Sequence, residues 1–261
     1  MTTPQPTLPQ VIQWAKEAGA IARAGFDREH TVHMKGALDL ATEIDHACER
    51  ALMDHIHSEF PSHAIVAEES GESAGDPEHC WYIDPLDGTL NYNHRLPIYA
   101  VSIAYAHKGK MELGVVYVPA LDECFSAQAG KGAWLNAAPI HVSSCASLQK
   151  AMFTAGMPSW DETKLDRSLA IVRRLNLNSQ GIRRLGSVAV ALCSLACGRI
   201  DGHVDLSSTP WDIAASTLII QEAGGLLTNF EGDPQYFKPP YSLIAVTPGI
   251  SEALRGLLIK N

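Results

Sequence analysis

Residues 81–92 read Trp-Tyr-Ile-Asp-Pro-Leu-Asp-Gly-Thr-Leu-Asn-Tyr, which places two carboxylates, a proline, a glycine and a threonine directly after an apolar run. The segment Cys80–Ile83 predicts a short buried strand, so Asp84 leaves the sheet at a strand end, where open α/β folds place ligands. Pro85 restricts the backbone and removes one donor, so Asp84 and Asp87 are presented on a stiff turn. This stretch indicates a metal site rather than a surface loop.

The turn that follows supplies a candidate anion cradle. Gly88 permits a close or left-handed backbone approach, and the amides of Gly88 and Thr89 can point at an anion as a helical turn begins. For an isolated stretch of this kind, an Asp-Pro turn with Asp87 as a helix cap would be the better interpretation. Further carboxylates elsewhere in the chain favour the metal site instead.

Two other segments of the chain end in acidic residues. Glu68 and Glu69 follow the apolar segment Ala64–Ala67, which predicts a second buried strand. Because adjacent side chains on an extended segment diverge, we expect at most one of these glutamates to face the site, and Glu68 is preferred, partly from the resemblance described below. Asp212 precedes an apolar run that stops at two glycines, which predicts an apolar helix with Asp212 as its acidic N-cap.

Convergence of these segments would bring four carboxylates into one cleft: Glu68, Asp84, Asp87 and Asp212. Such like charges repel one another and raise their pKa values unless cations neutralise them. Oxygen ligands suit a hard ion such as Mg²⁺, and the chain offers no Cys/His spacing typical of zinc. Two ions about 3.5–4 Å apart could activate a water and stabilise the leaving oxygen of a phosphate ester. The predicted chemistry is hydrolytic phosphoryl transfer.

Three ordered motifs of the chain resemble the signatures of the inositol monophosphatase family: Ile65–Ser70, Trp81–Tyr92 and Trp211–Gly225. The resemblance extends from about Val11 to the C-terminus. It implies an α/β fold of alternating helix and sheet layers, an αβαβα sandwich of the inositol monophosphatase and fructose-1,6-bisphosphatase type. Family members are Mg²⁺-dependent, commonly lithium-inhibited phosphomonoesterases, so the resemblance implies two or three Mg²⁺ ions per site.

The resemblance also assigns roles to individual residues. The residues that match metal ligands are Glu68, Asp84, the carbonyl of Leu86, Asp87 and Asp212. Asp45 matches the aspartate that pairs with the motif threonine, here Thr89, to orient and deprotonate the attacking water, and Glu68 counts with them as catalytic. Gly88 and Thr89 match amides that contact phosphate. Lys35 lies in a stretch that forms a mobile flap in relatives, where it could screen charge.

Substrate contacts are the part of the resemblance that differs most. The implied substrate-binding residues are Asp87, Gly88, Thr89, Gly186, Ser187, Val188, Asp205 and Asp212. Asp205 stands seven residues before the last metal aspartate, where relatives carry a glutamate that contacts the polyol, so its reach is one methylene shorter. A carboxylate there can still hold vicinal hydroxyls, and hydrogen-bonded hydroxyls are where specificity is strongest.

The expected substrate is therefore a small phosphorylated polyol, with inositol 1-phosphate as the first candidate. A histidinol-phosphate or fructose-1,6-bisphosphate phosphatase on the same scaffold is the alternative within enzymes. A noncatalytic protein-binding regulator is an alternative of a different class, which a missing metal ligand or a missing Thr89 would favour. Both are present.

Composition narrows the possible partners and location. The chain of 261 residues has a formal net charge of −9 and no Lys/Arg stripe, so we expect no nucleic-acid partner. No apolar run is long enough to cross a bilayer, so no membrane association is expected. The six cysteines lack paired CxxC spacing, and no secretory leader is recognised, which predicts reduced thiols in a cytoplasmic protein. The family resemblance implies a homodimer, and Arg183 and Arg184 are either solvated charges or interface residues.

Periodicity predicts alternating helices and strands in two halves. The expected helices cover about 11–26, 44–60, 164–175, 188–196, 213–220 and 251–259. The expected strands cover 64–67, 80–83, 100–106, 111–118, 123–127, 152–156, 182–184, 202–206, 226–228 and 243–246. A small polar stretch at 143–147 predicts a boundary between an N-terminal α+β half, 1–142, and a C-terminal α/β half, 143–261. The first half carries Glu68, Asp84 and Asp87 and the second carries Asp205 and Asp212, which would place the site between them.

Overall fold

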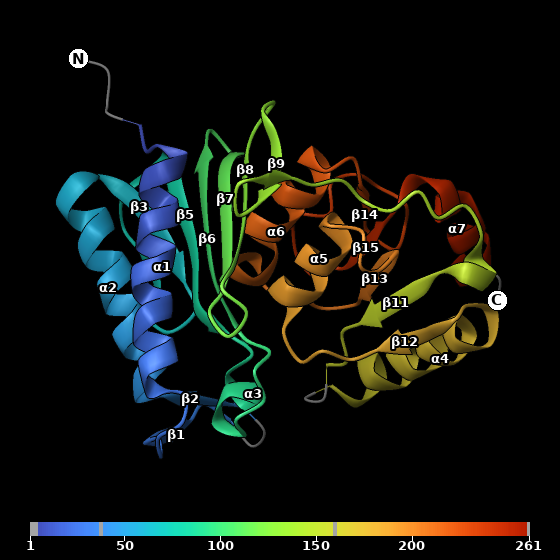
Figure 1. The fold of residues 1–261 in the computed structure, drawn as a ribbon, viewed down its shortest axis with the longest axis horizontal. Helices are drawn as coiled ribbons and strands as arrows, with labels where there is room; N and C mark the ends of the chain where they lie inside the picture. Colours follow the sequence, from blue (N-terminus) through green and yellow to red (C-terminus); the bar gives the residue numbers. More distant parts are fainter. Residues whose placement is uncertain (1–4, 37–38, 159–160, 260–261) are drawn as a thin grey trace.

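The computed structural model describes residues 5–36, 39–158 and 161–259, and these residues form alternating layers of helix and sheet (Figure 1). The helices are α1 (Leu8–Gly25), α2 (Glu43–Glu59), α3 (Thr89–Asn93), α4 (Glu162–Asn178), α5 (Val188–Ala196), α6 (Pro210–Glu222) and α7 (Ser251–Ile259). Helices α1 and α2 cover one face of a large sheet, α5 and α6 lie between the large and a smaller sheet, and α4 and α7 contact each other at the far side. The predicted αβαβα sandwich is confirmed.

The large sheet has eight strands in the order β10-β9-β8-β7-β6-β5-β3-β4. Its strands are β3 (His63–Ala67), β4 (Gly71–Ser73), β5 (Asp76–Asp87), β6 (Ala100–His107), β7 (Lys110–Val118), β8 (Glu123–Gln128), β9 (Gly132–Leu135) and β10 (Ala138–Pro139). Strands β3 and β5 are parallel neighbours, with Ala67 paired to Ile83. The amide of Glu68, just after β3, donates to the carbonyl of Ile83, so Glu68 lies beside Asp84 near the end of β5.

The smaller sheet has five strands in the order β12-β11-β13-β15-β14. Its strands are β11 (Met152–Ala155), β12 (Gly181–Arg183), β13 (Gly202–Asp205), β14 (Leu226–Thr228) and β15 (Leu243–Val246). Strand β11 pairs in parallel with both β12 and β13. The ends of β12 and β13 therefore lie at the same edge and direct the chain towards α5 and α6, the two helices that face the large sheet.

Helix α6 is the central element of the molecule because both sheets cover it. Every residue from Ile213 to Ile220 is buried, which explains why the segment is apolar on all sides and not on one face only. The helix approaches β7 so closely that a side chain at Gly114 would meet the backbone oxygen of Ala215 at 2.7 Å. This contact fixes the start of α6, and Asp212 with it, against the large sheet.

Several sequence expectations differ from the structure. A hairpin of β1 (Val32–Met34) and β2 (Leu40–Thr42) was not predicted, because its strands are only 3 residues long and β1 is exposed. Strand β5 runs far beyond 80–83, and its pairing with β6 shifts register between Asp84 and Asp87, where Pro85 cannot donate. Helix α6 begins at Pro210 with Thr209 as its N-cap, so Asp212 is its third residue and not its cap.

The two predicted halves share one hydrophobic core. Val116 and Phe125 of the large sheet pack in one cluster with Leu192 of α5 and Ile219 of α6. Each half contains a sheet of its own, and the boundary at 142/143 stays a prediction. Among the described residues, no helix has both the length and the apolar character needed to cross a membrane.

Candidate active site

Three carboxylates from both halves of the chain meet at one point. Carboxylate oxygens of Asp84, Asp87 and Asp212 lie within 4.8 Å of one another, with Asp84 and Asp87 buried and Asp212 partly buried. Strand β5 delivers the first two residues at its end, and the first turn of α6 delivers the third. The sequence predicted this meeting, because all three positions lie at the ends of apolar segments.

The electrostatics of the cluster favour a bound cation. Burial raises the pKa of Asp84 well above its ordinary value, and neighbouring carboxylates, first Glu68, add to the shift. Burial, together with the charge of Asp87, also raises the pKa of Asp212 well above its ordinary value. Buried carboxylates in mutual repulsion are stable only when protons or cations offset their charge. An oxygen-only set of this kind fits a hard divalent ion such as Mg²⁺.

Asp87 is held by the N-terminus of helix α5. Its carboxylate accepts hydrogen bonds from the Ser187 hydroxyl at 2.5 Å and from the amides of Val188 at 3.2 Å and Ala189 at 2.6 Å. Burial raises the pKa of Asp87, whereas these three donors act in the opposite direction. The contacts fix an oxygen ligand of the first half to a helix of the second half.

Glu68 faces a lysine of the β1–β2 hairpin. The ammonium of Lys35 donates to Glu68 at 2.9 Å and to Glu69 at 2.6 Å. Burial opposes the charge of Lys35, but the charge of Glu68 and the other carboxylate contacts outweigh it and raise the pKa of the lysine. Burial also raises the pKa of Glu69, to about 7.

Both glutamates contact Lys35, and the expectation that at most one of them faces the carboxylate cluster stays a prediction. Strand β3 ends at Ala67, so the strict alternation of an extended strand no longer applies to Glu68 and Glu69. Both carboxylates reach the same ammonium group.

A threonine and an aspartate form a hydrogen-bonded pair beside the cluster. The Thr89 hydroxyl lies 2.8 Å from Oδ1 of Asp45 and 3.0 Å from the carbonyl oxygen of Leu86. It has one proton, and the carboxylate is the stronger acceptor. The Leu86 carbonyl is then free to act as a metal ligand. The other oxygen of Asp45 accepts from the Thr42 amide at 2.8 Å, which fixes the carboxylate at the start of α2.

Gly88 has the conformation that the sequence suggested. Its φ of 96° is left-handed, and a Cβ on this residue would lie 2.8 Å from the backbone oxygen of Ile98. It is the N-cap of the short helix α3, whose first residue is Thr89. A larger residue would displace the turn that connects Asp87 to Thr89.

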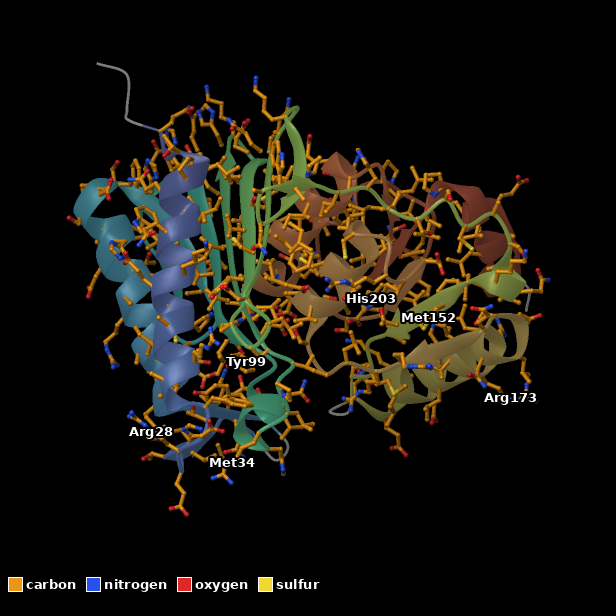
Figure 2. The ribbon with its side chains drawn as sticks, in the orientation of Figure 1. Arg28, Met34, Tyr99, Met152, Arg173 and His203 are labelled. Carbon is orange, nitrogen blue, oxygen red and sulfur yellow. The ribbon has the colours of Figure 1, made fainter. Side chains whose placement is uncertain are left out.

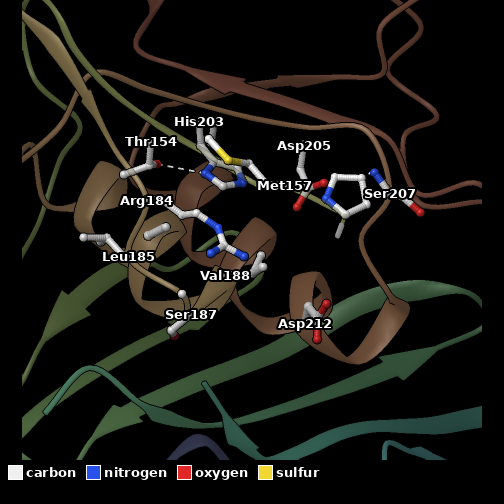
Figure 3. Close-up of a pocket in the computed structure, with 15 residues that line it drawn as sticks. Thr154, Met157, Arg184, Leu185, Ser187, Val188, His203, Asp205, Ser207 and Asp212 are labelled. Atoms are coloured by element: carbon white, nitrogen blue, oxygen red, sulfur yellow. Dashed lines mark hydrogen bonds between the residues drawn. The ribbon is translucent and has the colours of Figure 1, made fainter. Parts of the chain in front are cut away.

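A cavity of about 180 Å³ extends from Asp212 towards the smaller sheet (Figure 3). Its lining includes the predicted residues Gly186, Ser187, Val188 and Asp205. It also includes residues that the sequence analysis did not single out as site residues, among them Thr154, Met157, Arg184 and His203. Arg184 is exposed and lies at the cavity.

Two of the predicted substrate residues already have partners within the protein. The Ser187 hydroxyl and the Val188 amide donate to Asp87, so they position a metal ligand. Asp205 is buried, and one of its oxygens accepts from the Ser207 amide at 2.9 Å. Its carboxylate fills the space that a side chain at Gly156 would need, because a Cβ there would lie 2.0 Å from Oδ2.

The layered fold and the carboxylate cluster define a layered α/β protein with an acidic site suited to a divalent cation. Comparison with known sequences makes the assignment more specific. The chain belongs to the inositol monophosphatase family, whose profile matches residues 3–260.

Individual relatives agree with this assignment. Inositol monophosphatase 3 from Solanum lycopersicum is 40% identical over 227 residues, which cover 85% of each protein. Nus factor SuhB from Pasteurella multocida is 38% identical over 248 residues, which cover 94% of this chain and 92% of the relative. The crystal structure of extragenic suppressor protein suhB from Bartonella henselae superposes with a TM-score of 0.92 at 33% identity, over 96% of this chain and 97% of the other.

Proposed function

We propose that this protein is a Mg²⁺-dependent phosphomonoesterase that hydrolyses a small phosphorylated polyol, with inositol 1-phosphate as the first candidate. The observation that carries the proposal is the meeting of Asp84, Asp87 and Asp212 next to the hydrogen-bonded pair of Thr89 and Asp45. The three carboxylates account for cation binding, and the Thr89–Asp45 pair accounts for proton transfer. Hydrolysis of a phosphate ester needs both functions.

The cation ligands would be Glu68, Asp84, the Leu86 carbonyl, Asp87 and Asp212. When bound, Mg²⁺ ions would neutralise charge on the phosphate and lower the pKa of an attacking water. Two or three ions per site, a homodimer and a cytoplasmic location belong to the same proposal, because the family resemblance implies them. The ester phosphate would lie against the backbone amides of Gly88 and Thr89 at the turn after β5.

The proton of the attacking water has a path within the protein. The Thr89 hydroxyl directs its own proton to Asp45, which leaves the lone pairs of Oγ1 available to accept a hydrogen bond from water. Burial raises the pKa of Asp45, while its bonds from Thr42 and Thr89 oppose that shift. A raised pKa makes a carboxylate a better proton acceptor, so Asp45 is suited to receive the proton through Thr89.

The leaving alcohol would occupy the cavity beside Asp212. Asp205 lies in that cavity and can accept hydrogen bonds from alcohol hydroxyls. Since the Ser187 hydroxyl and the Val188 amide are bonded to Asp87, we assign these two residues mainly to the positioning of Asp87. Gly186 remains a candidate for direct contact with the alcohol.

Phosphate release from a panel of esters tests the proposal. The panel holds inositol 1-phosphate, histidinol phosphate, fructose 1,6-bisphosphate and glycerol 2-phosphate, each with Mg²⁺ or EDTA. We expect Mg²⁺-dependent turnover of inositol 1-phosphate that is lost in Asp84→Asn. The matched control is Asp54→Asn, which changes an exposed aspartate of α2 and should keep the native rate. Faster turnover of histidinol phosphate or fructose 1,6-bisphosphate would select the alternative substrate class.

A protein-binding role is the second candidate, because relatives with 36–38% identity are named Nus factor SuhB. It does not require phosphatase chemistry, although the complete set of carboxylates and Thr89 favours the enzyme. Folded protein that releases no phosphate from any ester of the panel would contradict the catalytic proposal and favour the protein-binding role.

A further inference from the structure

The cavity is also lined by a buried histidine that has no role in the proposed chemistry. His203 is the second residue of β13, it is 1% exposed, and it lines the cavity. Figure 2 places it in the interior of the molecule, whereas Arg173 lies on the outer surface of α4. A histidine buried between a sheet and an apolar helix such as α5 requires an explanation, because an apolar residue would fill this position at lower cost.

The neighbouring strand fixes one side of the imidazole ring. Strands β11 and β13 are parallel with Thr154 opposite His203, and the Thr154 hydroxyl lies 2.8 Å from Nδ1 of the ring. Residues two apart on a strand share a face, so Asp205 lies on the same side of the sheet as His203. In Figure 3 the ring nitrogen that is not bonded to Thr154 faces the side of the cavity where Asp205 lies.

That second nitrogen has no hydrogen-bond partner among the described residues. Nε2 of His203 is buried and unpaired, and a buried polar group without a hydrogen-bond partner destabilises the folded protein. Burial also lowers the pKa of His203, although Asp205 acts in the opposite direction, so the ring is neutral near pH 7. A neutral imidazole has one donor and one acceptor, which leaves Nε2 available for a single hydrogen bond.

We infer that His203 is a specificity-determining residue whose Nε2 bonds a hydroxyl group of the leaving alcohol, next to the hydroxyl that Asp205 binds. This inference rests on the proposed phosphatase function. A polyol fits this pair of groups, because vicinal hydroxyls can bond the carboxylate and the imidazole together. The site should strongly reject a substrate that lacks such a hydroxyl, because the buried groups of His203 and Asp205 would then have no hydrogen-bond partner.

An amino group is the other chemistry that could meet this pair of residues. An ammonium can donate to Asp205, but it can bond Nε2 only when Nε2 is the acceptor and Nδ1 carries the ring proton. A hydroxyl can donate or accept, so it matches either arrangement of the proton between Thr154 and His203. The geometry therefore favours a polyol over an amino alcohol.

A comparison of two esters tests this inference. Inositol 1-phosphate and cyclohexyl phosphate have the same six-membered ring, but the second lacks all other hydroxyls. In His203→Phe we expect kcat/KM for inositol 1-phosphate to fall at least tenfold, and kcat/KM for cyclohexyl phosphate to stay within about twofold of native. His203→Gln keeps a hydrogen-bonding group and should recover part of the lost kcat/KM for inositol 1-phosphate. It also provides the test if His203→Phe does not fold.

His63→Phe is the matched control. His63 is 2% exposed and its Nε2 also has no partner among the described residues, but it lies on β3 and does not line the cavity. This variant should change stability without changing the ratio of kcat/KM between the two esters. Histidinol phosphate as a third ester tests the ammonium alternative, and a larger loss for it than for inositol 1-phosphate would contradict our assignment.

A spectroscopic readout makes the test independent of turnover. In ¹⁵N-labelled Asp45→Asn protein with Mg²⁺, inositol 1-phosphate should shift the Nε2 resonance of His203 and leave that of His63 unchanged. An unchanged His203 resonance while the ³¹P signal shows binding would overturn the inference.

The kinetic outcomes separate the inference from the proposed function. An equal loss for both esters, or no loss, would overturn only the role of His203. Absence of turnover of every ester by the native protein would overturn the proposed function, and this inference with it.

Discussion

The hydroxyl of Thr89 donates to Oδ1 of Asp45 across 2.8 Å, although the two residues are 44 positions apart in the chain. Thr89 begins α3 at the end of the large sheet, and Asp45 is the third residue of α2. Asp45 is fully buried and its second oxygen is bonded to Thr42, so the carboxylate has one orientation. In the proposed mechanism, Thr89 of this pair connects the attacking water to Asp45 as the proton acceptor.

Replacement of Thr89 by valine should separate proton transfer from folding. Thr89→Val removes the hydroxyl with little change in shape, so we expect kcat to fall about 10²–10⁴-fold, the range typical of general acid–base contributions. KM should change much less, because the cation ligands remain. Steady-state kinetics on the preferred ester provide the measurement. Thr89→Ser keeps the hydroxyl and should retain most of the rate, and an unchanged kcat in Thr89→Val would exclude the proton path.

Removal of the Ser187 hydroxyl should weaken the connection between the two halves. In Ser187→Ala, Asp87 loses a hydrogen bond of 2.5 Å and the Val190 amide loses its cap. Hydrogen bonds to charged groups contribute about 1.5–3 kcal/mol, and we expect a loss of that size in the free energy of unfolding. Urea denaturation in EDTA measures it. Ser208→Ala removes a buried hydroxyl that has no partner among the described residues, so it should change stability far less.

A methyl group at Gly156 should displace Asp205. A Cβ there would lie 2.0 Å from Oδ2, so Gly156→Ala must move the carboxylate out of its place in the cavity. We expect kcat/KM for inositol 1-phosphate to fall by about 10–200-fold, the range expected for altered substrate contacts, with a smaller effect on cyclohexyl phosphate. Gly256→Ala is the control, because nothing lies within 4 Å of the added carbon. Equal kinetics in both variants would contradict a substrate role for Asp205.

Stability in the absence of metal should fall as pH rises. Burial and like charges raise the pKa of Asp84 and Asp212 in the folded state. A carboxylate with a raised folded pKa contributes most stability below its unfolded pKa and loses that contribution as pH rises through the folded pKa. Above the ordinary carboxyl pKa of about 4, the Tm in EDTA should therefore decrease more with rising pH for the native protein than for Asp84→Asn.

Magnesium should reverse this trend. At 100 times its Kd, a bound ion adds about 2.7 kcal/mol, which corresponds to a rise in Tm of roughly 5–10 °C for a chain of this size. The rise should be larger at pH 8 than at pH 6, because the ligands must be deprotonated to bind metal. Differential scanning calorimetry at both pH values measures it, and a smaller rise at pH 8 would contradict ion binding by the deprotonated carboxylates.

Most elements of the fold were predictable because their signals are local. The spans Val188–Ala196, Leu226–Thr228 and Leu243–Val246 were predicted with the bounds that the structure shows. The β1–β2 hairpin was missed because two strands of 3 residues, one of them exposed, carry no clear period. The N-cap of α6 was misplaced by three residues, since Thr209 and Asp212 form a capping box and either residue alone is a good cap.

The sequence by itself determined the family, the layered fold and the positions of the carboxylates at the ends of apolar segments. These are local patterns, and each segment carries its own signal. Only the tertiary structure decided which other distant groups meet: Ser187 with Asp87, Gly156 with Asp205, and His203 with the cavity. Such contacts depend on how both sheets pack against α5 and α6, and no single segment encodes that packing.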